Sequence, residues 1–97
     1  MSFEDLQGAV ISWASERNIL KGSNYESQLE KLNEEFEELK AATNKSGIAD
    51  AIGDMAVVLT ILAYFQGTTL DMCYRKAYFK IRDRKGKMIN GKFVKEK

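Results

Sequence analysis

The chain has 97 residues, a length that predicts a single domain, residues 1–97, with a modest hydrophobic core. Hydrophobic residues make up 44% and charged residues 30%, which is typical of a soluble globular protein. The one cysteine, Cys73, excludes an internal disulfide. The absence of histidine excludes His-based catalytic triads and His metal sites.

Two further features favour a cytoplasmic location without a membrane segment. The N-terminal segment has early acidic residues and no long apolar core, unlike a signal peptide. The apolar run from Met55 to Phe65 is shorter than the roughly 20 residues needed to span a bilayer. A single free cysteine also fits a reducing compartment.

The hydrophobic spacing predicts an all-α fold with a short C-terminal tail, and the absence of proline favours long helices. The helices are expected at residues 3–17, 25–42, 47–66 and 69–85, and the tail at residues 86–97.

Local signals set the ends of these elements. Ser2 and Asp5 have the spacing of a capping box for the first helix. Ser46 is a candidate cap for the third helix, and Gly67 is its candidate stop. Asn90-Gly91, between alternating residues, predicts a two-residue turn, so the tail is expected to hold a small hairpin of low independent stability.

The predicted helix 47–66 is apolar on almost every side, yet it carries Asp50 and Asp54 one turn apart. Buried acids are costly unless a positive group neutralises them. The preceding helix offers Glu35 and Glu38 at i, i+3 on the flank of its inward face. The short link between the two helices favours an antiparallel pair, which brings these four acids to similar heights.

Converging carboxylates predict a divalent cation, and oxygen ligands favour Mg²⁺ or Mn²⁺ over Ca²⁺. Mg²⁺ held in this way keeps open positions for phosphate oxygens, so the pattern favours phosphate chemistry. Two other interpretations stay open. A Glu-rich helix is commonly a solvated face, and Lys31, one turn before Glu35, is a competing positive partner, although one lysine cannot offset four acids.

The order of these acids follows a known pattern. Glu34, Glu35 and Glu38 read EExxE, and Asp54 follows after a spacer. This arrangement resembles the MazG-like, all-α nucleoside triphosphate pyrophosphohydrolases, whose pattern is EExxE, a spacer and then ExxD.

The chain departs from that pattern at the first acid of ExxD. Ala51 stands there, and Asp50 lies one position earlier, as in small phage-type members that are similar in reading DAIGD. The flanking segments WASERNILKGS and IRDRKGKM are also similar to that subgroup, so the resemblance covers most of the chain.

The resemblance implies a four-helix bundle-like fold and hydrolysis of a (d)NTP to the (d)NMP and pyrophosphate, with Mg²⁺ or Mn²⁺ as cofactor. Water attacks the α-phosphorus, and either Glu34 or the metal alone activates it. The implied metal ligands are Glu35, Glu38, Asp54 and Asp50, and the implied catalytic acids are Glu34, Glu35 and Glu38. The implied substrate-binding residues are Lys76, Lys80, Arg82 and Arg84 for the pyrophosphate and Trp13 and Gln28 for the base.

A second departure lies in the fourth predicted helix. Similar proteins often read AYNEIKDRKG there, whereas this chain has Phe79 in place of the asparagine and Lys80 in place of the glutamate. The lost asparagine is polar and expected near the nucleotide, so the usual substrate preference is in question.

Related activities stay open, namely dUTP hydrolysis and phosphoribosyl-ATP pyrophosphatase activity, as does a non-enzymatic helical interaction module. The acids of residues 26–38 and the net charge of +1 argue against a nucleic-acid partner. Single-domain members of the family are similar in forming homodimers or homotetramers. The apolar third helix gives the same expectation, because three neighbours in one chain cannot easily cover it.

Overall fold

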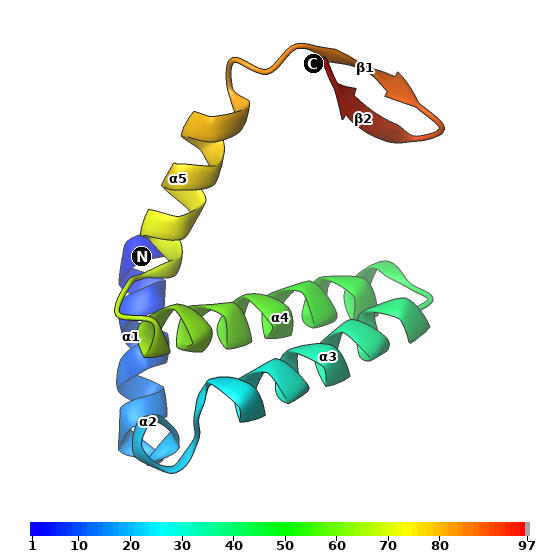
Figure 1. Cartoon of the computed structure of the whole chain (residues 1–97). Coiled ribbons are helices and arrows are strands. Elements are labelled where there is room, and N and C mark those ends of the chain that lie inside the picture. Colours follow the sequence, from blue (N-terminus) through cyan, green and yellow to red (C-terminus); the bar gives the residue numbers. More distant parts are fainter. Residues whose placement is uncertain (97) are drawn as a thin grey trace.

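The computed structural model describes residues 1–96, most of which are helical (Figure 1). The helices in this range are α1 (Phe3–Glu16), α2 (Ile19–Gly22), α3 (Tyr25–Ala41), α4 (Lys45–Phe65) and α5 (Leu70–Ile81). The strands β1 (Gly86–Ile89) and β2 (Lys92–Lys95) pair in an antiparallel hairpin. The predicted all-α character and the predicted hairpin are therefore confirmed.

Capping side chains explain where the helices begin. The Ser2 hydroxyl accepts from the backbone N–H of Asp5 at 3.0 Å, and the Asp5 carboxylate accepts from that of Ser2 at 3.1 Å, as predicted. The prediction that Ser46 caps α4 is wrong. The Asn44 side chain accepts from the backbone N–H of Gly47 at 2.8 Å, because Asn44 is the last extended residue before the helix.

Two other boundaries differ from the prediction. The segment after α1 contains the short helix α2, and Asn18 begins it in the left-handed conformation that asparagine tolerates. α5 ends at Ile81 rather than Lys85. The chain turns at Arg82 and Asp83 and then runs extended into Gly86, since pairing of β1 with β2 requires extended backbone there.

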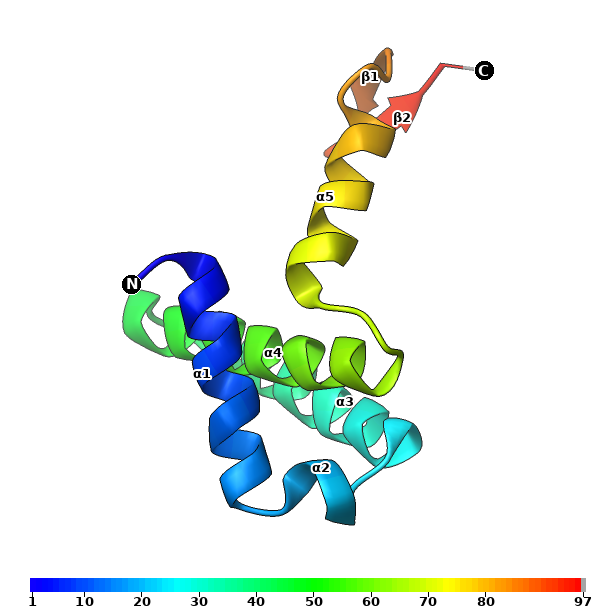
Figure 2. The ribbon, with the colours of Figure 1, turned by 90° about the vertical axis from the view of Figure 1, so that its left-hand side faces the viewer.

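The helical body consists of α1 to α4 and has α4 at its centre. α3 and α4 lie antiparallel across the short link of residues 42–44, as predicted, and α1 crosses α4 on one side (Figures 1 and 2). α5 leaves the body at the C-terminal end of α4 and carries the hairpin at its far end. The body therefore positions the acidic residues, while the segment from α5 onward projects from it.

α4 supplies most of the buried core. The buried hydrophobic side chains are Ala14, Ala51, Val58, Ile61, Leu62 and Ala63. Ile48, Ile52 and Leu59, spaced by four and seven residues, form a stripe along α4 that residues 1–96 cover only in part, and Ile52 is 56% exposed. α4 is thus a core helix on one side and an exposed apolar surface on another.

α4 is also, within residues 1–96, the one helix long and apolar enough to cross a membrane by length and composition. Its most apolar 18-residue window has a mean hydropathy of 1.8, and a third of that window is buried in this chain. The core helix of a soluble protein passes the same test of length and composition.

The hairpin offers a test of the fold through Gly86. A Cβ at this position would meet the Val94 carbonyl oxygen, the Phe93 ring at 2.7 Å and the Lys95 Cα at 2.9 Å. We expect Gly86→Ala to unpair β1 from β2 and to leave the far-ultraviolet helical signal of the body unchanged. Hydrogen exchange and cross-strand nuclear Overhauser effects would measure this.

Gly8→Ala is the matched control, because a Cβ at Gly8 meets nothing within 4 Å. It should stabilise α1 by about 0.5–1 kcal/mol through the lower entropy of the unfolded chain. Intact cross-strand contacts in Gly86→Ala would contradict the pairing described here.

Candidate metal centre

Three carboxylates converge between α3 and α4. Glu35 and Glu38 extend from α3 and Asp54 from α4, and one oxygen of each lies within 4.8 Å of the others. The i, i+3 spacing puts the two glutamates on one flank of α3, and the antiparallel pairing brings Asp54 to the same height. Like charges this close repel one another, so the cluster needs a positive charge or a shared proton.

The burial of Glu35 strengthens the need for a positive charge or a shared proton in the cluster. Its side chain is buried, with 6% of the residue exposed. One oxygen, Oε1, lies 3.2 Å from the Lys31 ammonium, whereas Oε2 is buried and has no hydrogen-bond donor among the described residues. An unpaired buried carboxylate oxygen is costly. A hard divalent cation bound by oxygen ligands would remove this cost, so the donor set fits Mg²⁺ or Mn²⁺.

The pKa of Glu38 is affected by the same neighbouring carboxylates. Its pKa is raised above the ordinary value of 4.5, because a protonated Glu38 can donate a hydrogen bond to Glu35 and because the Glu35 charge repels its ionised form. Partial desolvation and Asp54 add to the rise, and Lys31 opposes it. In the absence of a cation, a proton is therefore the group that the cluster attracts.

Lys31 is the competing partner that the sequence suggested. Its pKa is raised, chiefly by its hydrogen bond and Coulombic attraction to Glu35 and also by Glu34, whose carboxylate lies 3.9 Å away. The lysine is half exposed and contacts only Oε1 of Glu35. It offsets one charge of the three-acid cluster and leaves a net negative charge.

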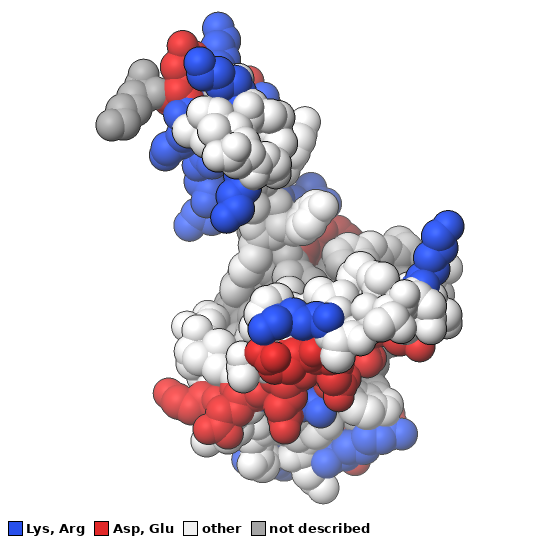
Figure 3. Space-filling view, turned by 90° about the vertical axis from the view of Figure 1, so that its right-hand side faces the viewer, with Lys and Arg blue, Asp and Glu red and all other residues white. Residues whose placement is uncertain are grey.

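The other predicted site residues lie outside this cluster. Asp50 is exposed one helical turn before Asp54, and Glu34 is exposed beside Lys31. The predicted pyrophosphate-binding residues Lys76 and Lys80 lie on α5, and Arg82 and Arg84 follow it. Figure 3 shows the cations gathered over α5 and the hairpin and the acids in a separate band on the body, so one chain does not bring them together.

Hollows in the surface adjoin the cluster. One, of about 530 Å³, is bounded by Glu35, Asp54 and Trp13 and by apolar residues of α1 and α4. A second, of about 980 Å³, is bounded by Trp13, Gln28 and Glu34 among others. Trp13 borders both hollows, whereas Gln28 borders only the second, which contains no acid of the cluster.

The wall of these hollows contains residues that the sequence interpretation did not identify. Leu6, Val10 and Val57 line the first hollow, and the Arg17 guanidinium lies 4.9 Å from the centre of the Trp13 ring. The apolar periodicity of residues 3–17 was a signal for α1 as a packing helix, but it does not reveal which neighbour α1 faces.

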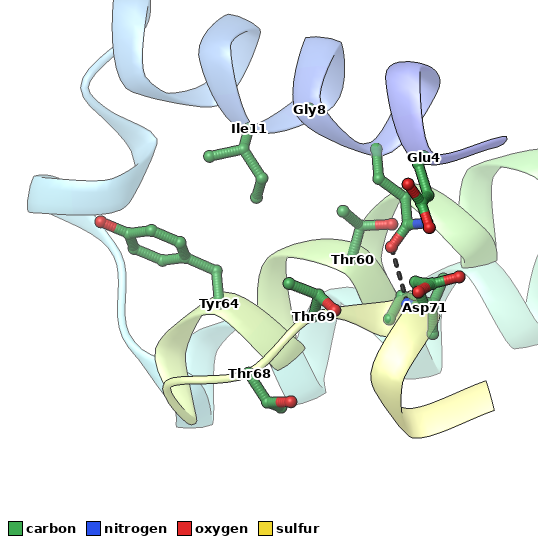
Figure 4. A pocket seen from close by; sticks show the side chains of 10 residues that line it. Glu4, Gly8, Ile11, Thr60, Tyr64, Thr68, Thr69 and Asp71 are labelled. Carbon is green, nitrogen blue, oxygen red and sulfur yellow. Dashed lines mark hydrogen bonds between the residues drawn. The ribbon is translucent and has the colours of Figure 1, made fainter. Parts of the chain in front are cut away.

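A third hollow, of about 420 Å³, lies between α1 and the start of α5 (Figure 4). There the Gln7 side chain accepts a hydrogen bond of 2.8 Å from the backbone N–H of Asp71. This bond ties the first turn of α5 to α1, and the hollow does not include the acids of the cluster.

Comparison with known proteins gives little beyond this geometry. The chain matches no known family profile, and no solved structure matches it. It is 44% identical over 57 residues to a protein of Haemophilus phage HP1 (strain HP1c1) named "Uncharacterized 18.2 kDa protein in rep-hol intergenic region". The match covers 56% of this chain and 35% of the phage protein, so the chain spans about a third of that relative's length.

Thermal melting with and without Mg²⁺ or Mn²⁺ tests the centre directly. At a cation concentration about 100 times Kd, we expect the melting temperature to rise by roughly 10–20 °C, since only the folded cluster binds the ion. Glu38→Gln and Asp54→Asn should abolish most of this shift and stabilise the cation-free protein by removing repulsion.

Glu37→Gln is the matched control, because Glu37 is exposed on the same helix and lies outside the cluster. It should keep the full shift, and Asp50→Asn should keep most of it. Equal shifts in all five proteins, or none in any, would show that the cluster binds no cation.

The raised pKa of Glu38 predicts a pH dependence. Folding penalises ionised Glu38, so the penalty is complete above the raised pKa and absent below 4.5, the value for an unfolded chain. Without divalent cations, the wild type should therefore gain stability relative to Glu38→Gln as the pH falls through this window. Denaturant titrations of both proteins across the window would measure the difference, and a constant difference would contradict the assignment.

Proposed function

We propose that the chain is a Mg²⁺-dependent nucleoside triphosphate pyrophosphohydrolase of the MazG-like kind, which cleaves a (d)NTP to the (d)NMP and pyrophosphate. The observation that carries the proposal is the buried, unpartnered Oε2 of Glu35 inside a three-carboxylate cluster beside an open hollow. The carboxylates of an acidic surface patch are exposed to solvent. A centre that binds a cation and a polyanionic ligand, by contrast, has a buried carboxylate.

Each acid has a proposed task. Glu35, Glu38 and Asp54 would hold the ion, and Asp50 is the expected fourth acid, one turn earlier on α4. The bound ion would stabilise charge on the phosphate oxygens and lower the pKa of water. Glu34 borders the same hollow as Trp13 and Gln28, so it can accept a proton from water held beside a substrate there.

The base would lie against Trp13. Its indole ring offers a flat face for stacking, and Arg17 on the same ring adds a positive charge near the phosphates. Gln28 can donate and accept hydrogen bonds at the edge of a base, although its amide N–H₂ now donates to the Ser23 hydroxyl at 3.0 Å.

Lys76 and Lys80 on α5, and Arg82 and Arg84 after it, would offset charge on the leaving pyrophosphate. Phe79, which replaces the polar residue of similar proteins, lies 4.8 Å from the Arg82 guanidinium. It therefore orients a cation instead of contacting the nucleotide through an amide.

A homodimer or homotetramer would complete the four-helix bundle expected for this family. The α4 stripe of Ile48, Ile52 and Leu59 is exposed, and so are Leu29 and Phe36 on the neighbouring helix α3. Burying these side chains against a second α3–α4 pair would give the bundle its core. We propose a cytoplasmic location, where nucleotide substrates are found, and the phage relative is in keeping with the phage-type subgroup.

Pyrophosphate release from a panel of NTPs and dNTPs with Mg²⁺ tests the activity. We expect Glu38→Gln and Asp54→Asn to lower kcat/KM by at least about 100-fold, because the ion supplies several kcal/mol of charge stabilisation. Glu37→Gln should retain wild-type rates. Inclusion of dUTP and phosphoribosyl-ATP separates the related activities, and no release from any substrate would favour a non-enzymatic interaction module.

Trp13 provides a separate binding readout, since it is the one tryptophan of the chain. A non-hydrolysable triphosphate should change its fluorescence in the presence of Mg²⁺, and Asp54→Asn should weaken that binding by about tenfold or more. An unchanged spectrum at saturating nucleotide would place the base elsewhere.

A further inference from the structure

Residues 70–96, here called the arm, comprise α5 and the hairpin. The arm makes few contacts with the rest of the chain. No side chain of α5, β1 or β2 is buried. The arm exposes large apolar side chains along its whole length: Met72, Tyr74, Tyr78, Phe79, Ile81, Met88, Ile89, Phe93 and Val94. Such a run of exposed apolar residues is typical of a surface that another molecule covers.

The arm is anchored to its own body only near its base. The Gln7 side chain accepts from the backbone N–H of Asp71 (Figure 4), and Arg75 pairs with Glu4 at 3.3 Å. Beyond Arg75, the last six residues of α5 and a two-stranded hairpin would have to stand alone. Neither is stable by itself in water, so the arm requires a surface to pack against.

The direction of the arm keeps it from its own body. The link after α4 passes through Gly67, whose φ of +73° favours glycine, and it turns α5 away from α3 and α4. Within the part of the chain that the structure describes, Lys76, Lys80, Arg82 and Arg84 make no ion pair with an acid of the body.

The charges of the two parts are equal and opposite. Residues 1–69 contain five basic and eleven acidic residues, a net charge of −6. Residues 70–96 contain nine basic and three acidic residues, a net charge of +6. Figure 3 shows basic side chains predominating on the arm and a band of acidic side chains on the body.

We infer that the arm of one copy docks on the acidic face of α3 and α4 in a second copy, in a reciprocal exchange. Two such contacts related by a two-fold axis form a closed pair. The exchange brings Lys80 and Arg84 of one copy to the exposed carboxylates of the other and covers the apolar side chains of the arm. It rests on packing and charge and does not require the hydrolase activity.

The charge balance favours a second copy over a polyanion as the occupant. The body carries as much negative charge as the arm carries positive charge, so a nucleic acid drawn to the arm would be repelled by the body. A second copy satisfies both parts at once.

Paired charge reversals test the exchange by sedimentation equilibrium of the full chain. Lys80→Glu with Arg84→Glu makes the arm negative, and Glu30→Lys with Glu37→Lys makes the exposed face of α3 positive without touching the three-acid cluster. The wild type should associate to at least twice 11.0 kDa and dissociate as salt rises. Each double variant alone should associate at least about tenfold more weakly.

Mixing the two double variants is the decisive step. The negative arm of one then meets the positive face of the other, and the unchanged arm meets the unchanged face, so association should return. Lys21→Glu with Lys45→Glu is the control for the arm variant: it makes the same change in net charge but on the body, and it should not weaken association. Circular dichroism of each variant checks that the helices remain folded.

Several results would overturn the exchange: a wild-type monomer at every salt concentration, association that neither reversal weakens, or a mixture that fails to associate. Retention of a monomer on duplex DNA or anionic vesicles, lost in the arm variant, would assign the arm to that partner instead. A pyrophosphate-release assay separates this inference from the proposed function. Association of the chain without activity would contradict only the proposed hydrolase. Activity in a monomeric chain would contradict only the inferred exchange.

Discussion

The contact between α3 and α4 controls both the fold and the candidate site, and Glu35 is its critical residue. The same packing that buries the apolar side of α4 also buries this carboxylate and removes water from Oε2. Lys31 satisfies one oxygen and cannot serve the other. A buried carboxylate oxygen without a hydrogen-bond partner therefore lies where the core meets an open hollow, and the proposed cation site rests on this oxygen.

The parts of the fold that depend on neighbouring residues were predictable. The capping box of Ser2 and Asp5, the antiparallel α3–α4 pair and the Asn90-Gly91 turn follow from short-range spacing. Asn44 replaced Ser46 as the cap of α4 because both residue types suit that role and only the path of the link decides between them. α2 and the early end of α5 were missed because the segments around them carry weak and mixed signals.

In the candidate site too, the local features were predictable from the sequence and the long-range features were not. Helical spacing and a short link were sufficient to bring Glu35, Glu38 and Asp54 together, because each step is local. Asp50 differs from Asp54 by one turn of α4, a distance that spacing alone does not resolve. The side on which α1 packs, which places Trp13 beside the acids, and the direction of α5 depend on contacts between distant segments, so no periodicity in the sequence could supply them.

The open shape of the chain links these observations. Within residues 1–96, the body of four helices leaves apolar stripes on α3 and α4 partly exposed, and the arm exposes its own apolar side chains. In one copy the acids that attract cations and the cations that would bind a polyanion lie on separate parts. A chain whose two parts have opposite net charge and unburied apolar surface is complementary to itself. The inferred exchange between two copies would cover this apolar surface, and it would bring basic residues to the carboxylates of the proposed triphosphate site.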